Sequence, residues 1–152
     1  MPVIVKPLVD AGFGAKGLKK WSTYDGGGYQ YTLTHDRKAV AMVTNGGHGG
    51  PVEIEWKPDM DVAKARLAEV VASIPPIESY GRMLTVNDEF LMEELVNHTD
   101  LVKVCKKKTA FRTPEDSERS YKVINAPFDA EVREYVISKW PKAIILNENL
   151  FA

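Results

Sequence analysis

A loop of glycines around one histidine is the part of this chain best suited to hold a ligand. The loop reads Asn45, Gly46, Gly47, His48, Gly49, Gly50 and then Pro51. Backbone N–H groups in such a loop can form a concave anion site, and the imidazole could add a hydrogen bond or a proton. The loop lacks the Lys-Ser/Thr of a Walker loop and the spacing of a dinucleotide fingerprint. The alternative is a wide turn whose glycines serve only chain geometry.

A second glycine segment, Asp25-Gly26-Gly27-Gly28, lies one strand earlier. In an antiparallel meander the second strand ends beside the start of the first, so both glycine segments fall at one end of the sheet. We therefore expect Asp25, Gly27 and Gly28 to face the histidine loop across one rim and to share in binding. Asp25 and His48 could there support acid–base chemistry, but no further catalytic residues accompany them, and we expect a protein that is not an enzyme.

A basic run offers an alternative surface, for nucleic acid. It consists of Lys103, Lys106, Lys107, Lys108 and Arg112. Clustered Lys and Arg suffice for phosphate contacts, and Phe111 and Tyr121 could stack on bases. The alternative is a solvated strand edge, where lysines oppose aggregation.

Metal and cofactor sites are not expected. The chain has one cysteine, Cys105, which excludes an intramolecular disulfide and a multi-cysteine zinc site. The histidines, His35, His48 and His98, have no metal-ligand spacing to one another. Lone cysteines are usually small buried apolar residues, and nothing places a base beside this one.

Alternating and helical hydrophobic patterns predict the elements that must position these residues. Strands are expected at 29–34, 39–44 and 52–56 as a meander, helices from Pro58 to Ile74 and from Asn87 to Asn97, and a connector at 75–84. Residues 101–105 fit helix or strand. A hairpin is expected at 109–113 and 120–124, a helix from Asp129 to Trp140 with Val132, Tyr135 and Val136 on its apolar stripe, and a strand at 143–146. Segregated runs of this kind favour an α+β fold with one antiparallel sheet of about five or six strands packed by three helices.

Length and net charge limit the number of domains and the kinds of partner. A chain of 152 residues fits one α+β domain over 1–152, with residues 1–20 as a short strand and loop or a partly mobile arm. The net charge of −1 gives no global field for nucleic acid. No stretch approaches the roughly 20 apolar residues that span a bilayer, and a cytoplasmic location is the default.

A resemblance rests on residues at both ends of the chain. Trp21-x-Thr23-Tyr24, Gly26-Gly27-Gly28-Tyr29, Asp36-x-Lys38-Ala39-Val40-Ala41 and the Asn45–Gly50 loop are followed by Lys107-Lys108-Thr109-Ala110-Phe111-Arg112, by Val132 to Trp140 and by Ile144 to Glu148. This pattern resembles a group of small proteins of bacteriophages and other mobile elements. The likeness spans most of residues 13–149 and carries no established activity.

The resemblance implies a setting rather than a reaction. Small phage proteins of this kind often act on host machinery, including host antiviral defence, by binding. We therefore expect a non-enzymatic accessory protein, in the host cytoplasm if phage-encoded, that binds a host factor or a small nucleotide through the glycine segments. The alternative is a nucleic-acid-binding protein that uses Lys103 to Arg112, and exposed strand edges leave room for a homodimer.

Overall fold

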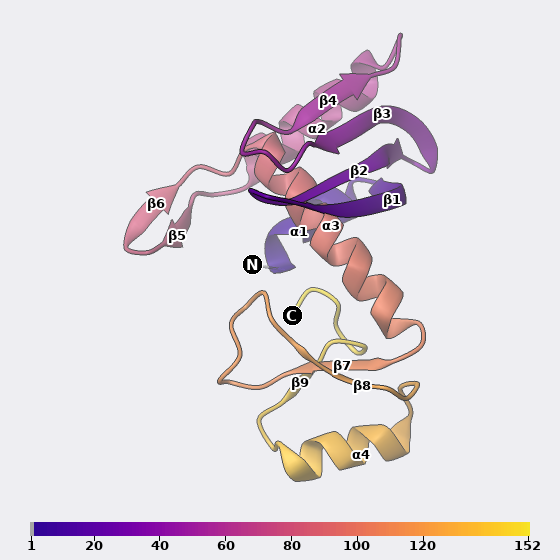
Figure 1. The fold of residues 1–152 in the computed structure, drawn as a ribbon, viewed down its shortest axis with the longest axis vertical. Helices are drawn as coiled ribbons and strands as arrows, with labels where there is room; N and C mark the ends of the chain where they lie inside the picture. The colour runs from indigo at the N-terminus through magenta and orange to yellow at the C-terminus, as the bar shows by residue number, and fades with distance from the viewer. Residues whose placement is uncertain (1) are drawn as a thin grey trace. The chain divides into compact units, whose positions relative to one another are not determined.

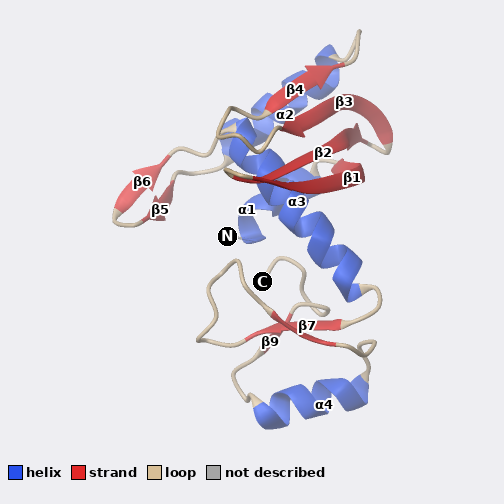
Figure 2. Ribbon diagram, viewed as in Figure 1, coloured by secondary structure: helices blue, strands red, loops and turns tan. Residues whose placement is uncertain are grey.

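The computed structural model describes residues 2–152, which fall into two compact units. The first unit is Lys6–Val96, and the second is Asn97–Ala152 together with the chain before Lys6. A single domain over residues 1–152 stays a prediction. The elements of both units are drawn in Figures 1 and 2.

The first unit is built on a four-stranded antiparallel sheet with the strand order β1-β2-β3-β4. Its strands are β1 (Phe13–Thr23), β2 (Gly26–His35), β3 (Lys38–Asn45) and β4 (Glu53–Trp56). The predicted meander is confirmed and gains β1 as an edge strand. The turn between β2 and β3 has Asp36 and Arg37 in the left-handed region, with φ of 50° and 69°, as tight hairpin turns require.

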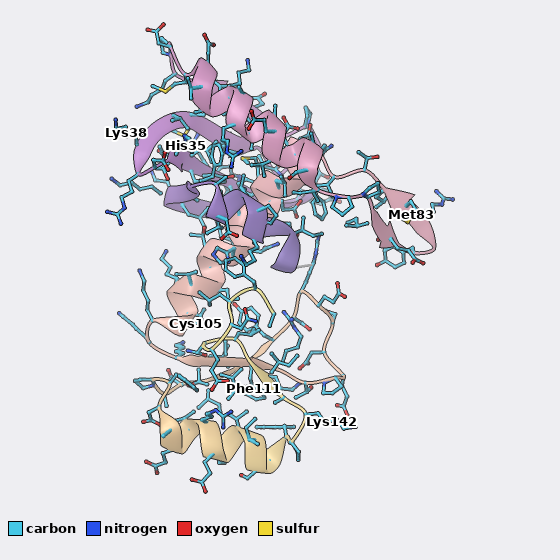
Figure 3. All side chains as sticks on the ribbon, turned by 180° about the vertical axis from the view of Figure 1, so that it is seen from behind. His35, Lys38, Met83, Cys105, Phe111 and Lys142 are labelled. Atoms are coloured by element: carbon cyan, nitrogen blue, oxygen red, sulfur yellow. The ribbon has the colours of Figure 1, made fainter. Side chains whose placement is uncertain are left out.

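One face of this sheet is buried and the other is open. Tyr31, Leu33 and Val43 alternate with polar residues along β2 and β3 and are at most 1% exposed. Figures 1 and 3 show helices on this buried side only. The Tyr31 hydroxyl donates to the carbonyl oxygen of Met92, on helix α3, at 3.0 Å, and burial raises the pKa of Tyr31.

The N-terminal segment corrects our expectation of a strand and loop. Residues Pro2–Asp10 form helix α1, and β1 begins at Phe13. Val5 and Leu8 lie one helical turn apart and are both buried, and Lys6 Nζ pairs with Asp10 Oδ2 at 2.6 Å four residues on. The β-branched run at 3–5 suggested a strand, because β-branched residues are enriched in strands and a proline such as Pro7 usually interrupts a helix.

Two helices and a hairpin follow the sheet. Helix α2 (Asp61–Ser73) buries Ala63, Leu67 and Val70, as its spacing predicts. The predicted connector contains a small hairpin of β5 (Ile77–Ser79) and β6 (Arg82–Leu84). Helix α3 (Asp88–Cys105) begins at Asn87, whose side chain accepts from Phe90 N at 2.9 Å, and it continues through the ambiguous residues 101–105.

The second unit packs helices on both faces of a three-stranded sheet. Strands β7 (Thr109–Arg112), β8 (Lys122–Ile124) and β9 (Ile144–Ile145) are ordered β8-β7-β9, which confirms the predicted hairpin. Helix α4 (Ala130–Lys139) is capped by Asp129, which accepts from Val132 N at 2.8 Å. On the α4 side Phe111, Val136 and Ile145 form a core cluster, whereas Leu101 and Leu146 pack with Ala110 on the other.

The α+β class is therefore confirmed, with a different arrangement of strands. The described residues contain four helices, and the strands form three separate antiparallel sheets rather than one sheet of five or six. The difference arises because residues 77–84 pair only with each other and β7 pairs with β8 and β9.

Candidate functional site

The two glycine segments meet at one end of the four-stranded sheet, as the meander predicts. Tyr29 and Asn45 are direct partners across β2 and β3, which places Gly28 beside the loop after Asn45. A Cβ atom added at Gly47 would lie 2.9 Å from the backbone nitrogen of Gly28. We call this surface, made of residues 24–28 and 45–50, the glycine rim.

Glycines of the rim serve different purposes. Gly28 and Gly47 are buried where backbone packs on backbone, and Gly47 also has φ of +80°. Gly49 has φ of +78° but open space around its Cα. Gly50 has neither a positive φ nor a close neighbour. Close packing therefore demands glycine at only two of these positions.

Side chains from β1 hold the histidine loop in place. Trp21 Nε1 donates to the carbonyl oxygen of Gly46 at 3.3 Å, and its indole covers Gly28. The Thr23 hydroxyl can donate to the carbonyl oxygen of Gly47 or, at 3.0 Å, to that of Gly26. Gly47 N donates to Asn45 Oδ1 at 2.9 Å, so this N–H is used inside the loop and is not offered to an anion.

The rim presents three exposed side chains above this fixed backbone. His48 Nδ1 lies 3.8 Å from Asp25 Oδ2, and these side chains are 71% and 54% exposed. Tyr24, at the turn between β1 and β2, is fully exposed. A contact this exposed contributes little to stability, so these side chains are accessible to a partner.

Two buried tyrosines stack on the inner face of the strand that leads to the rim. Tyr29 is 6% exposed, and its ring stacks on that of Tyr31 with centroids 5.9 Å apart. Burial, together with the nearby carboxylate of Glu93, raises the pKa of Tyr29 to about 12. Tyr29 therefore stays neutral and supports the strand that carries Gly28.

Sequence reasoning placed the glycines and His48 but left out Trp21, Thr23 and Tyr24 from the site. The pairing of Trp21 with Gly28 and of Thr23 with Gly26 brings them there. An aromatic residue opposite a strand glycine is a recognised way to cover the gap that the glycine leaves. That signal is usable only once the register of β1 is known.

The four lysines of the alternative basic surface are exposed, whereas its arginine is bound within the fold. Lys103 is on the last turn of α3, and Lys106, Lys107 and Lys108 are exposed in the turn that follows. Arg112 is committed to the fold, since its guanidinium donates to the carbonyl oxygens of Ser120 at 3.1 Å and Ala152 at 2.9 Å.

The expectation that Phe111 stacks on bases is wrong. Phe111 is 1% exposed, and its ring packs on Trp140 with centroids 4.8 Å apart. Its strand position alternates toward α4, so the side chain belongs to the core.

The other candidate residues, His35, His98 and Cys105, pack against neighbouring residues in the fold. His35 Nε2 lies 3.0 Å from the carbonyl oxygen of Ala11, and its ring stacks on Phe13. His98 stacks on Phe151, and burial lowers its pKa. Burial raises the pKa of the Cys105 thiol, which disfavours the reactive thiolate. Across residues 2–152 no three His, Cys, Asp or Glu side chains gather in an arrangement that could hold a metal ion.

No protein-family model, curated protein or solved structure matches this chain. Within residues 2–152, no helix has both the length and the apolar character needed to cross a membrane.

Proposed function

We propose that this protein acts by binding a macromolecular partner, without catalysis, and that the glycine rim is its binding surface. The observation that carries the proposal is the fixing of the histidine loop by Trp21 and Thr23, which holds His48 beside Asp25 before any partner arrives. A surface that is ordered in advance loses less conformational entropy on binding.

The exposure of the rim favours a protein partner over a small nucleotide. Small ligands are mostly enclosed in concave sites, whereas Tyr24 is fully exposed and His48 is largely so. Tyrosine is enriched in the residues that dominate protein–protein binding energy. Because Gly47 N donates to Asn45 Oδ1, one backbone N–H fewer is available to bind a nucleotide phosphate.

The resemblance to phage and mobile-element proteins suggests the class of partner. On that resemblance, we propose a host protein as the target, with a component of antiviral defence as the first class to examine. The pattern behind this resemblance includes the rim residues Gly26 to Gly28 and Asn45 to Gly50.

A paired capture experiment tests the proposal. The protein is immobilised and incubated with bacterial host lysate as wild type, as Tyr24→Ala/His48→Ala and as Tyr80→Ala. Tyr80 is a control because it is as exposed as Tyr24 but lies in the turn between β5 and β6. We expect a protein retained by wild type and Tyr80→Ala and lost with the double variant. Retention by all three would contradict a binding role for the rim.

Calorimetry tests whether the rim binds a nucleotide instead of a protein. Wild type and Tyr24→Ala/His48→Ala are titrated with nucleoside mono-, di- and triphosphates. Heat of binding that the double variant abolishes would replace the protein partner with a nucleotide at the same rim.

Nucleic-acid binding by the turn after α3 is the second candidate. The observation in its favour is that Lys106, Lys107 and Lys108 are consecutive and exposed. It predicts affinity for DNA or RNA that falls steeply with salt and is lost when all three lysines become alanine. Absence of binding at low salt would exclude it.

A further inference from the structure

The four-stranded sheet has one face that no helix of the first unit covers. This outer face is opposite to Tyr31 and Leu33, and Figure 1 shows α1, α2 and the start of α3 behind the sheet. Gln30 and Thr32 of β2, and Met42 and Thr44 of β3, lie at its centre. Gln30 Nε2 donates to Thr44 Oγ1 at 3.1 Å, and Met42 is 38% exposed. Except for Met42, the residues at the centre of this face are polar.

A β-bulge places two lysines on this face. Lys16 pairs with Thr32 and Lys19 with Gln30. Two residues of β1, Gly17 and Leu18, therefore lie opposite one residue of β2, Tyr31. In a regular strand, residues three apart point to opposite faces, and the extra residue brings Lys16 and Lys19 to the same one. Gly17, with φ of +67°, supplies the left-handed backbone in this bulge.

The registers then define two rows across the sheet. The first row is Lys16, Thr32, Met42 and Glu55, and the second is Lys19, Gln30, Thr44 and Glu53. Each row begins with an exposed lysine on β1 and ends with an exposed glutamate on β4. Three strand spacings separate these charges by about 14 Å, so they cannot pair within one sheet.

We propose that two copies of this chain pack outer face against outer face, about a two-fold axis parallel to the strands. This rotation reverses the strand order and keeps the position along each strand. It therefore sets Lys16 over Glu55 of the second copy and Lys19 over Glu53 of the second copy. Each contact occurs twice by symmetry, and Met42 faces Thr32 at the centre. The interface is isologous, as closed two-fold dimers require.

Charge distribution selects a second copy over a nucleic acid. The basic edge on β1 would attract phosphates, but Glu53 and Glu55 on the opposite edge would repel a strand laid across the face. The two rows carry no net charge and are complementary only to a surface with the reverse order. Within the described residues, none of these four charged side chains forms an ion pair in its own copy.

Charge reversal with mutual rescue tests this dimer. Sedimentation equilibrium is measured for wild type, Lys16→Glu/Lys19→Glu, Glu53→Lys/Glu55→Lys and an equal mixture of the two variants. We expect a wild-type dimer that weakens between about 50 mM and about 500 mM salt. Each double variant should raise the dimer Kd by about 100-fold or more, because like charges then face each other. The mixture should regain the dimer as a heterodimer.

The control is Lys64→Glu/Arg82→Glu, which lowers the net charge as much as Lys16→Glu/Lys19→Glu does, at exposed positions on α2 and β6. It should leave the dimer Kd unchanged. A wild type that stays monomeric at low salt overturns the proposal, whether or not it binds single-stranded DNA. A mixture that stays monomeric, or a control that dissociates like the test variants, overturns it as well.

Discussion

Glycines of the rim illustrate how one residue type meets different physical demands. At Gly47 the backbone is left-handed and packed against Gly28 and Thr23, whereas at Gly49 only the left-handed backbone applies. Gly50 meets neither demand. The three positions therefore form a graded series for the loop that holds His48.

Alanine substitutions along this series should destabilise in that order. Gly47→Ala should cost about 2–4 kcal/mol, since the new Cβ would meet Thr23 Cγ2 at 2.8 Å and Gly28 N at 2.9 Å in a strained backbone. Gly49→Ala should cost about 1 kcal/mol, from its backbone alone. Gly50→Ala should stay within about 0.5 kcal/mol. Urea unfolding measures all three.

Equal costs at Gly47 and Gly50 would show that the close approach at Gly47 does not constrain the loop. Gly47→Ala is accordingly a poor probe of binding, because it perturbs the loop itself. Tyr24→Ala and His48→Ala remove exposed side chains and leave the loop backbone in place.

The glycine clusters and the predicted meander located the rim in the sequence. The pairing of β1 with β2 added the residues that support it. The glycine clusters and His48 are visible in the sequence because so many glycines in one turn exceed what chain reversal needs. The roles of Trp21 and Thr23 depend on which residue each one faces across β1 and β2. Sequence periodicity could not supply that register, because the bulge between Lys16 and Lys19 shifts it.

At the scale of elements, strong local patterns predicted what formed. The alternation in β2 and the caps Asn87 and Asp129 gave correct strands and helix starts, because each depends on neighbours within a few residues. The α1 helix and the β5–β6 hairpin were missed. The short β-branched run before α1 carries a weak local preference, and the burial of Val5 and Leu8 decided its structure. The β5–β6 hairpin pairs only with itself, through a left-handed turn at Tyr80 and Gly81 that we did not predict.

Asn147 is an element-scale joint that the sequence did not single out for a role. Its side-chain oxygen accepts from Ala110 N at 2.8 Å, and its amide donates to the carbonyl oxygens of Lys108 at 2.9 Å and Cys105 at 3.3 Å. It thus ties the end of α3 and the start of β7 to the segment after β9.

Asn147→Ala should therefore destabilise the protein by about 2–4 kcal/mol, since a buried N–H at Ala110 loses its acceptor. Asn125→Ala, at an exposed position, is the matched control and should change stability by less than about 0.5 kcal/mol. Chemical denaturation compares the two. A loss at Asn147 no larger than at Asn125 would show that the joint is not needed.

The tip of the β7–β8 hairpin carries the clearest pH dependence. Hydrogen bonds from the Lys122 ammonium, at 2.6 Å, and from the backbone and hydroxyl of Thr113 lower the pKa of Asp116 to about 2. A lowered carboxyl pKa stabilises the folded state above the unfolded value near 4, and this contribution disappears as the pH falls toward 2.

An NMR titration of the Asp116 carboxyl should give a midpoint near 2 in wild type. In Lys122→Met the midpoint should move up toward the ordinary range, because the largest cause is removed. An unchanged midpoint in Lys122→Met would assign the low pKa to Thr113 instead.

For the whole molecule, the rim and the outer face belong to the same sheet but to different parts of it. The charged rows cross the sheet at Lys16 and Lys19, whereas the rim lies at the strand ends near Thr23 and Asn45. The proposed partner surface and the proposed dimer interface are therefore expected to be separable by mutation.

Separate variants should show that independence. Lys16→Glu/Lys19→Glu should lose the dimer and keep the partner captured by the rim, and Tyr24→Ala/His48→Ala should do the reverse. Sedimentation and capture are run on both proteins. Loss of both properties in either variant would mean that the two surfaces act as one.

The central claim is that the rim contacts a partner, and site-specific photo-crosslinking tests it most directly. A photo-reactive amino acid replaces Tyr24 in one protein and Tyr80 in another, and both are irradiated in host cells. Because both side chains are fully exposed, they differ in location and not in accessibility. We predict one discrete crosslinked host protein from position 24 and none from position 80. The same products from both positions, or none from position 24, would contradict a partner surface at the rim.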